Sequence, residues 1–184
     1  MQALLVVDAQ NEFSAAGKRA VANHHLALEA IEAHVQLARA DKRPIAWVKH
    51  YNRPHESPAF VPGTWGAELS PGLGPEDGFG PERVFEKDVY GAFTGTRLEE
   101  WLRSLRVETL LVVGFYAHMC LSTTVREALI RDFRVLVDPA ATGAADLEHP
   151  VLGRKSSVEV RNGALLHLVH MGAELTSAHL PVAV

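Results

Sequence analysis

The sequence contains one cysteine, Cys120, whose position suggests a nucleophile. An apolar run, Thr109 to Gly114, precedes it, and a helical pattern opens at about His118. A strand that stops at a glycine and turns into a helix leaves backbone N–H groups unpaired, and these amides favour negative charge, as does the positive end of the helix dipole. A thiol there ionises more readily than one in a core, and the thiolate is the nucleophilic form.

Two charged side chains form a coherent set with this thiol. Asp8 follows the apolar run Ala3 to Val7, and Lys87 ends the run Arg83 to Lys87. We expect these residues and Cys120 to meet beyond the carboxyl ends of parallel strands, where sites form in open α/β sheets. Asp8 can take the thiol proton, and Lys87 can hold that carboxylate and favour thiolate. A lone cysteine is otherwise usually a small buried hydrophobe, so the three residues are interpreted together.

The elements that position these residues alternate between strands and helices. Apolar runs predict strands at Ala3 to Val7, Pro44 to His50, Arg83 to Lys87, Thr109 to Gly114, Phe133 to Val137 and Ala173 to Leu175. Helical spacing predicts helices at Val21 to Ala40, Leu98 to Leu105, about His118 onward and, as a mainly helical segment, Val151 to Met171. This alternation gives βαβ units with a mostly parallel sheet between two helix layers. We therefore expect one Rossmann-like three-layer α/β domain over residues 1–184.

One connection, Tyr51 to Pro81, is unusually long. It has roughly thirty residues, rich in Pro and Gly, where compact α/β domains use about 2–6. Such a segment is usually a lid, a site wall or a subunit contact. Its stretch Gly72 to Gly80 superficially resembles a phosphate-binding loop, but it follows no predicted strand and opens no clear helix, so no phosphate cradle is expected.

Composition excludes several classes of protein. The formal net charge of −4 offers no basic face for a polyanion, so nucleic acid is not an expected partner. No apolar run approaches membrane-spanning length, and the start lacks the basic leader of a signal peptide. A lone thiol cannot form an internal disulfide, which fits a reducing compartment. We expect a cytoplasmic globular protein, whose 184 residues, 47% hydrophobic, can bury one sizeable core.

Three blocks resemble the signature blocks of the isochorismatase-like cysteine hydrolase superfamily, which includes nicotinamidases and N-carbamoylsarcosine amidohydrolases. They are DAQNEF at 8–13, EKDVYGAFTGTRLEEWL at 86–102 and VVGFYAHMCLSTTVREAL at 112–129. The resemblance implies a parallel sheet of six strands in the order 3-2-1-4-5-6 and a catalytic triad of Asp8, Lys87 and Cys120. It also implies a cis peptide at Tyr116–Ala117, with the backbone amides of Ala117 and Cys120 as the oxyanion hole.

The resemblance also indicates a substrate-binding wall. Family members place aromatic residues near the positions of Phe13, Tyr90 and Phe93, so these side chains are expected to line the site, although packing in the core or in loops is the alternative. Tyr116, beside the expected cis bond, faces either the site or a neighbouring subunit. Relatives are typically dimers or higher oligomers, so a homo-oligomer is expected.

The chain departs from the family pattern at several positions. Many relatives carry threonine in place of Ala117, which removes a hydroxyl from the site. The Asp-x-His-Pro metal motif of nicotinamidases corresponds to Tyr51-Asn52-Arg53-Pro54, which has neither ligand. His167 and His170 share a helix face but have no third ligand with suitable spacing. We therefore expect neither a metal nor a cofactor.

The predicted function is a metal-independent cysteine hydrolase that cleaves a C–N bond of a small amide, imide or carbamoyl substrate through a thioester. Family members that cleave the vinyl ether of isochorismate generally lack the nucleophilic cysteine, so Cys120 disfavours that reaction. The alternative is a catalytically silent binding or scaffold protein of the same fold. A dinucleotide oxidoreductase is disfavoured, because DAQNEF stands where its glycine motif would follow the first strand.

Overall fold

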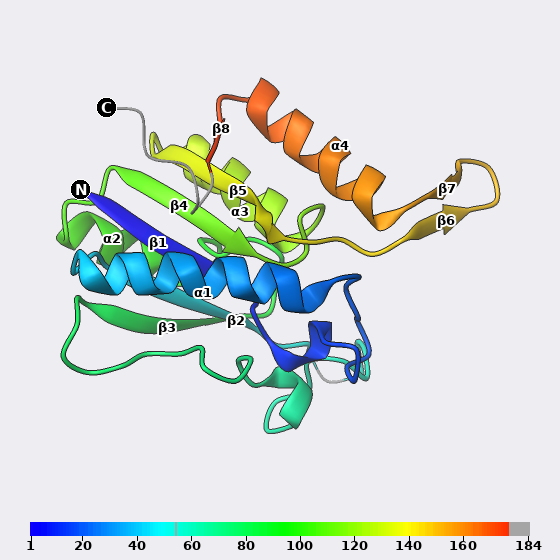
Figure 1. Cartoon of the computed structure of the whole chain (residues 1–184), viewed down its shortest axis with the longest axis horizontal. Helices are drawn as coiled ribbons and strands as arrows, with labels where there is room; N and C mark the ends of the chain where they lie inside the picture. The colour runs from blue at the N-terminus through cyan, green and yellow to red at the C-terminus, as the bar shows by residue number, and fades with distance from the viewer. Residues whose placement is uncertain (54, 177–184) are drawn as a thin grey trace.

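A parallel sheet of six strands forms the centre of the computed structural model, which describes residues 1–53 and 55–176. The strands, in the spatial order β3-β2-β1-β4-β5-β8 (Figure 1), are β1 (Gln2–Val7), β2 (Ile45–His50), β3 (Glu82–Lys87), β4 (Thr109–Gly114), β5 (Arg134–Thr142) and β8 (Glu174–Leu175). The predicted order 3-2-1-4-5-6 is confirmed, with β8 as the sixth strand. Residues 54 and 177–184, which the single-domain prediction included, lie outside the described residues.

Helices cover both faces of this sheet, which confirms the three-layer α/β class (Figure 1). One face carries α1 (His24–Ala40), and the other carries α2 (Leu98–Ser104), α3 (Cys120–Leu129) and α4 (Ser157–His170). Two 3-10 turns, η1 (Asn11–Phe13) and η2 (Trp65–Ala67), lie beside each other near the carboxyl ends of the strands.

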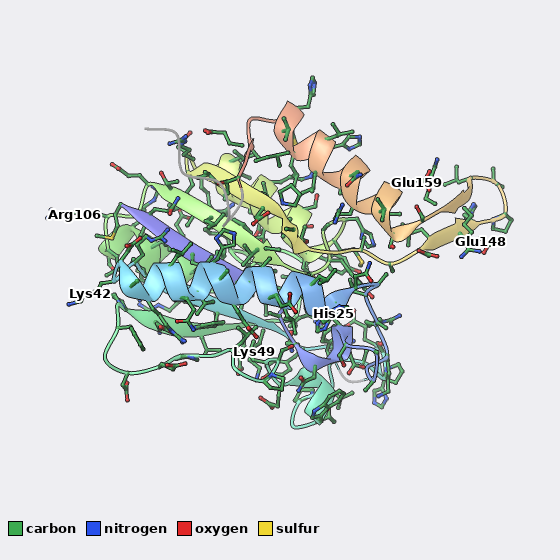
Figure 2. The ribbon with its side chains drawn as sticks, in the orientation of Figure 1. His25, Lys42, Lys49, Arg106, Glu148 and Glu159 are labelled. Atoms are coloured by element: carbon green, nitrogen blue, oxygen red, sulfur yellow. The ribbon has the colours of Figure 1, made fainter. Side chains whose placement is uncertain are left out.

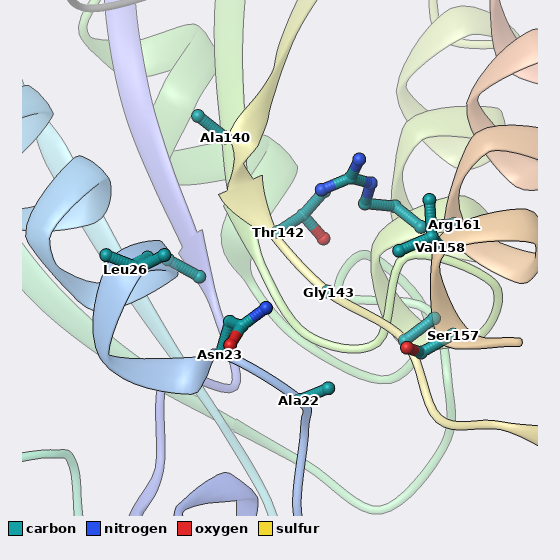
Figure 3. A pocket seen from close by; sticks show the side chains of 11 residues that line it. Ala22, Asn23, Leu26, Ala140, Thr142, Gly143, Ser157, Val158 and Arg161 are labelled. Carbon is teal, nitrogen blue, oxygen red and sulfur yellow. The ribbon is translucent and has the colours of Figure 1, made fainter.

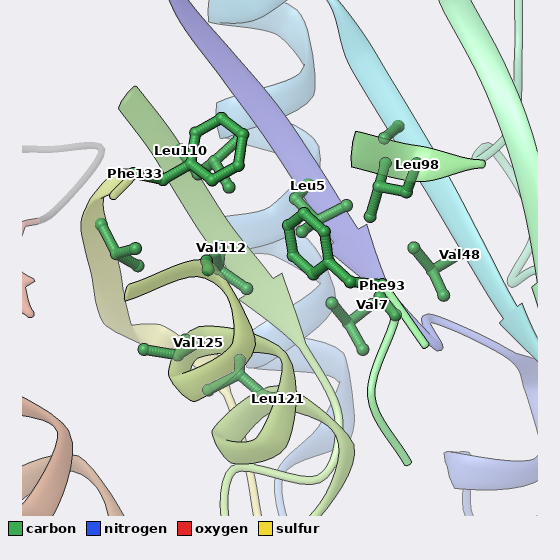
Figure 4. Close-up of a cluster of buried hydrophobic side chains, with 14 of the residues drawn as sticks. Leu5, Val7, Val48, Phe93, Leu98, Leu110, Val112, Leu121, Val125 and Phe133 are labelled. Carbon is green, nitrogen blue, oxygen red and sulfur yellow. The ribbon is translucent and has the colours of Figure 1, made fainter. Parts of the chain in front are cut away.

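The first strand shows how the apolar runs build the core. Leu5 and Val7 pack into the cluster beneath α2 and α3 (Figure 4), whereas Leu4 and Val6 pack beneath α1. Successive side chains of a strand point to opposite faces, so a strand covered on both sides reads as a continuous apolar run. The same two-sided burial explains the apolar character of β4.

Strand register brings the chemistry-bearing residues to one edge of the sheet. Val7, the last residue of β1, aligns with Val48 of β2 and with Gly114 of β4, and His50 aligns with Lys87. Asp8 follows at once, and its N–H donates to the Val48 carbonyl at 2.9 Å. The carboxyl ends of four neighbouring strands therefore open onto a common space.

The segment that was predicted as mainly helical from Val151 begins as a hairpin. Strands β6 (Leu147–His149) and β7 (Gly153–Lys155) pair in antiparallel fashion and project from the molecule, with Glu148 on this arm (Figures 1 and 2). Gly153 has a φ of 77°, which glycine adopts without steric cost. The α4 helix starts only at Ser157, where the side chains of Ser156 and Glu159 form a capping box.

The described residues contain no helix with the length and apolar character needed to cross a membrane.

Candidate active site

Cys120 is the first residue of α3 and lies in a cleft at the carboxyl edge of the sheet. The cleft has a volume of about 500 Å³, within the range of small-molecule sites. Besides the strand ends, its walls come from residues in the segments 52–60, 116–119 and 145–147. The long 51–81 connection therefore contributes a wall of the cleft, one of the roles expected for it.

Asp8 and Cys120 line this cleft, and Lys87 lies against both of them. Lys87 Nζ donates to Asp8 Oδ2 at 2.8 Å, with side chains that are 0% and 1% exposed. A donor atom of Cys120, one of Asp8 and one of His50 all lie within 4.8 Å of one another. Asp8 and Lys87, which are 79 positions apart in the sequence, are thus in one polar cluster with Cys120.

The pKa of the Cys120 thiol is shifted in the direction opposite to that predicted from the sequence. Burial, followed by the Asp8 carboxylate, raises the pKa of the Cys120 thiol, while the Lys87 ammonium lowers it less. Cys120 is only 7% exposed, so desolvation outweighs the favourable position at the start of α3. Burial is the largest single influence on Lys87 and lowers its pKa, but the interactions with Asp8 and Cys120 together outweigh burial and raise the pKa of Lys87. Burial and the Asp8 carboxylate therefore favour the thiol over the thiolate at Cys120.

The predicted role of the Ala117 amide is wrong. Its N–H donates to the Gly143 carbonyl at 2.8 Å, so it is not free to bind an oxyanion. The cis peptide bond is Phe115–Tyr116 and not Tyr116–Ala117. The Phe115 N–H still donates a hydrogen bond to the Val7 carbonyl of β1 at 2.9 Å, whereas the Ala117 N–H donates to Gly143. The chain therefore leaves the sheet between Phe115 and Ala117.

Two other amides of this turn are unpaired. Neither the Tyr116 N–H nor the Cys120 N–H donates a hydrogen bond within the part of the chain that the structure describes. Both residues line the cleft. The unpaired amides of this turn are therefore those of Cys120 and Tyr116, and not that of Ala117.

Three of the four predicted substrate-contacting aromatics line the cleft: Phe13, Tyr90 and Tyr116. Phe13 packs edge-on against Tyr116, with ring centroids 4.7 Å apart, and against Phe60 at 5.2 Å. Phe60 adds to this wall and was not predicted.

Phe93 lies elsewhere, which corrects its predicted position. It is buried in the core between the sheet and α3, where its ring packs against Phe133 at 5.9 Å (Figure 4). Its N–H donates to the Glu127 carboxylate of α3 at 2.9 Å, and the neighbouring Ala92 N–H donates to Thr124. These bonds direct the segment toward α3 and away from the cleft.

His50 and Asn52 belong to the site and were missed. His50 Nδ1 lies 3.3 Å from Lys87 Nζ, and its Nε2 lies 3.0 Å from Asn52 Oδ1. His50 is the last residue of the second predicted strand, so the rule that identified Asp8 and Lys87 applies to it equally. His118, whose buried Nδ1 has no partner among the described residues, also lines the cleft.

Among the described residues, one group of side chains has ligand atoms close enough together to hold a metal ion. This group is Asp8, His50 and Cys120. The Lys87 ammonium already donates to Asp8 and contacts His50. A second cation among these groups would face strong repulsion at short range. The residues present therefore do not fit a metal.

A second hollow lies apart from this chemistry. It has a volume of about 280 Å³ and is bordered by the start of α1, the end of β5 and the start of α4. Figure 3 shows its polar side chains, which are Asn23, Thr142, Ser157 and Arg161. No thiol, carboxylate or imidazole lines it, so the cleft at Cys120 is the candidate active site.

Comparisons of the sequence and of the structure with known proteins indicate the same family. The isochorismatase domain model matches residues 2–179. The secreted isochorismatase effector of Verticillium dahliae is 35% identical over 144 residues, which cover 78% of this chain and 73% of that protein. Nicotinamidase 3 of Arabidopsis thaliana is 30% identical over 159 residues, covering 79% and 75%. The crystal structure of an isochorismatase from Pseudomonas putida superposes with a TM-score of 0.87 at 28% identity, covering 96% of this chain and 88% of that one.

Proposed function

Since the chain belongs to the isochorismatase family, we propose that it is a cysteine hydrolase that cleaves a C–N bond of a small amide, imide or carbamoyl compound. The observation that carries this proposal is that Cys120 and Asp8 line one cleft, where Lys87 donates a hydrogen bond to Asp8. A nucleophile beside a base that a third group holds in place is the arrangement that covalent catalysis requires.

The first half of the reaction forms a thioester. Cys120 Sγ attacks the carbonyl carbon while its proton passes to Asp8, because the resting thiol is protonated. The carbonyl oxygen becomes an oxyanion, which collapses as the C–N bond breaks. Asp8 returns its proton to the leaving nitrogen, which departs as ammonia or an amine, or, for a cyclic imide, stays attached to the acyl group as a primary amide.

The second half hydrolyses the thioester. Asp8 takes a proton from water, whose oxygen attacks the thioester carbon. The C–S bond then breaks, the thiolate recovers the proton from Asp8, and the carboxylic or carbamic acid leaves. Lys87 stays protonated throughout and holds Asp8 Oδ2 through the bond of 2.8 Å.

The unpaired amides of Tyr116 and Cys120 support this scheme. Both belong to the turn that begins α3, and both residues face the cleft. One donor aimed at a developing oxyanion typically contributes about 3–4 kcal/mol to acyl transfer. The Phe13, Phe60 and Tyr116 rings supply an apolar wall for the rest of the substrate.

The proposal is tested by ammonia release from a panel of primary amides, ureido acids and cyclic imides. Ring opening of the imides is followed by absorbance, with Cys120→Ala as the blank. We expect at least one compound to be hydrolysed by the native protein and not by Cys120→Ala, and a quenched reaction to show the acyl mass on Cys120.

Isochorismate belongs in the same panel, because a relative carries the isochorismatase name. Turnover of isochorismate that survives Cys120→Ala, with no hydrolysis of any amide, would overturn the proposal. The thiol must also stay reduced, and we therefore propose that the protein acts in a reducing compartment such as the cytoplasm.

A further inference from the structure

His50 is held more completely than any role as a cleft wall requires. Its backbone N–H donates to Gln10 Oε1 at 2.8 Å, and its carbonyl accepts from Gln10 Nε2 at 3.0 Å. The ring packs edge-on against Phe60, with centroids 5.3 Å apart, and both ring nitrogens have partners. A buried glutamine thus clamps the backbone while Asn52 and Lys87 fix the imidazole.

The partners assign the tautomer of this imidazole. An ammonium has only donors, so His50 Nδ1 must accept from Lys87, and the proton of the neutral ring resides on Nε2. That Nε2–H donates to Asn52 Oδ1, whose Nδ2 donates to the Ala59 carbonyl at 2.6 Å. The chain of bonds ends on a backbone acceptor, so each direction in it is determined.

This arrangement completes the surroundings of the Lys87 ammonium. One N–H donates to Asp8, a second faces His50, and the Cys120 thiol lies within interacting distance of the same group. Without the imidazole, the second N–H would be buried without an acceptor, and the ammonium would shift to find one.

We propose that His50 is a positioning residue, which accepts a hydrogen bond from Lys87 and thereby holds its ammonium between Asp8 and Cys120. It is not a general base, because one ring nitrogen faces Lys87 and the other faces Asn52. This inference rests on the proposed function, since it assigns His50 a part in the same reaction.

Protonation of His50 should abolish this role. The imidazolium cannot accept a hydrogen bond and would place a second cation 3.3 Å from Lys87. The titratable groups that face His50 are Asp8 at the end of β1, Lys87 of β3, Glu56 of the 51–81 connection, Asp88 after β3 and the Cys120 thiol of α3. Burial, followed by Lys87, outweighs the acidic groups and lowers the pKa of His50 below its ordinary 6.5. The positioning should therefore operate at neutral pH and be lost only as pH falls through this lowered pKa.

Two substitutions separate positioning from packing. His50→Asn keeps an acceptor, Oδ1, near the place of Nδ1 but cannot ionise, whereas His50→Leu removes the acceptor and retains an apolar side chain. We expect His50→Leu to lower kcat by about 10- to 100-fold with little change in KM, and His50→Asn to stay within about threefold of the native protein. In His50→Asn the acid limb of the kcat profile should move to lower pH. The exposed His25, at the start of α1 (Figure 2), gives matched controls as His25→Leu and His25→Asn.

Alkylation of Cys120 by iodoacetamide gives a readout that needs no substrate. Lys87 lowers the pKa of the thiol, so a displaced ammonium should slow alkylation in His50→Leu by about threefold or more and leave it unchanged in His50→Asn. Equal rates in His50→Leu and the native protein, or equal deficits in both variants, would overturn the inference. If His50→Leu does not fold, the pH profiles of kcat for His50→Asn and the native protein still test the inference. An acid limb at the same pH in both proteins would overturn it. A failed substrate panel with these alkylation rates as expected would count against the proposed function alone.

Discussion

Asp8 combines an unusual backbone conformation with an unpaired oxygen. Its φ is 52°, in the left-handed region that Asp and Asn tolerate better than other non-glycine residues. Oδ2 is held by Lys87, whereas the buried Oδ1 has no hydrogen-bond partner among the described residues. A carboxylate that is anchored through one oxygen and open at the other suits repeated proton transfer with a neighbouring thiol.

Asp8→Asn preserves this conformation and removes the charge. Because the carboxylate raises the pKa of Cys120, its loss should lower that pKa and accelerate alkylation by iodoacetamide near pH 8. The same variant should lose about 10²- to 10⁴-fold in kcat for a substrate from the panel, because the base is gone. Opposite changes in alkylation and turnover are the expected signature. A parallel decrease in both would mean that the base, rather than the local field, governs thiol reactivity.

Lys87→Met tests the buried ion pair by removing the cation at nearly constant length. It leaves the Asp8 carboxylate buried without its partner, so the free energy of unfolding at pH 7 should fall by about 3–5 kcal/mol. The pKa of Lys87 is raised above 10.5 in the folded state, so its contribution is complete below that pH and is lost only as pH rises through the folded pKa. Urea denaturation at several pH values measures the difference.

The exposed pair of Arg134 and Glu174 is the control for that experiment. Its atoms lie 2.7 Å apart, as close as in the buried pair, but both side chains are in water. Arg134→Met should therefore hardly change stability. Equal losses for Arg134→Met and Lys87→Met would contradict the role of burial.

At the scale of elements, the junction of β4 with α3 places both the nucleophile and the unpaired amides. Gly114 ends β4 with a φ of 116°, and a Cβ added there would lie 1.9 Å from the Val7 carbonyl oxygen of β1. Glycine is required because the backbones of the two strands approach closely where the chain leaves the sheet.

Gly114→Ala should therefore destabilise the protein by more than about 1 kcal/mol and lower turnover with it, since the misplaced turn carries Cys120. Gly163→Ala, within α4, is the matched substitution at a site with open space and no positive φ. It should raise stability by about 0.5–1 kcal/mol and leave turnover unchanged. Midpoints of urea unfolding with unchanged m values provide the comparison. If Gly114→Ala left both stability and turnover unchanged, the requirement for glycine at this junction would be contradicted.

At the scale of the whole molecule, exposed apolar side chains gather on the projecting arm and the outer face of α4. Val151 and Leu152, between β6 and β7, are 84% and 80% exposed, and Leu166 of α4 is also exposed. A monomer rarely leaves such an apolar surface uncovered, so we expect the arm to be an interface between copies of the chain.

Sedimentation equilibrium should give a mass that is a multiple of the 20.1 kDa chain. The double variant Val151→Asp with Leu152→Asp should shift the protein toward the monomer, because an interface does not accommodate unpaired buried charges. Ile130→Asp, at an exposed position after α3, is the control and should leave the mass unchanged. A native protein that stays monomeric at micromolar concentration would contradict the prediction that the arm is an interface.

The sequence alone predicted the alternation of strands and helices, the strand order and the three residues Asp8, Lys87 and Cys120. The strand order came from the resemblance of three sequence blocks to a known family. The alternation and the three residues depend on local signals, which are apolar runs that must be buried on both faces and reactive residues at the ends of such runs. His50 carried the same signal and was overlooked. The β6–β7 arm was missed because Val151 and Leu152 make an exposed hairpin look like part of a buried helix.

Only the tertiary structure decided the properties that depend on distant neighbours. Burial and Asp8 raise the pKa of Cys120 and outweigh the local helix start. Whether the Ala117 amide is free depends on the Gly143 carbonyl, which lies 26 residues further along the chain. The position of Phe93 depends on two bonds to α3. Hydrogen bonds and desolvation are set by atoms that meet in space, so spacing along the chain does not specify them.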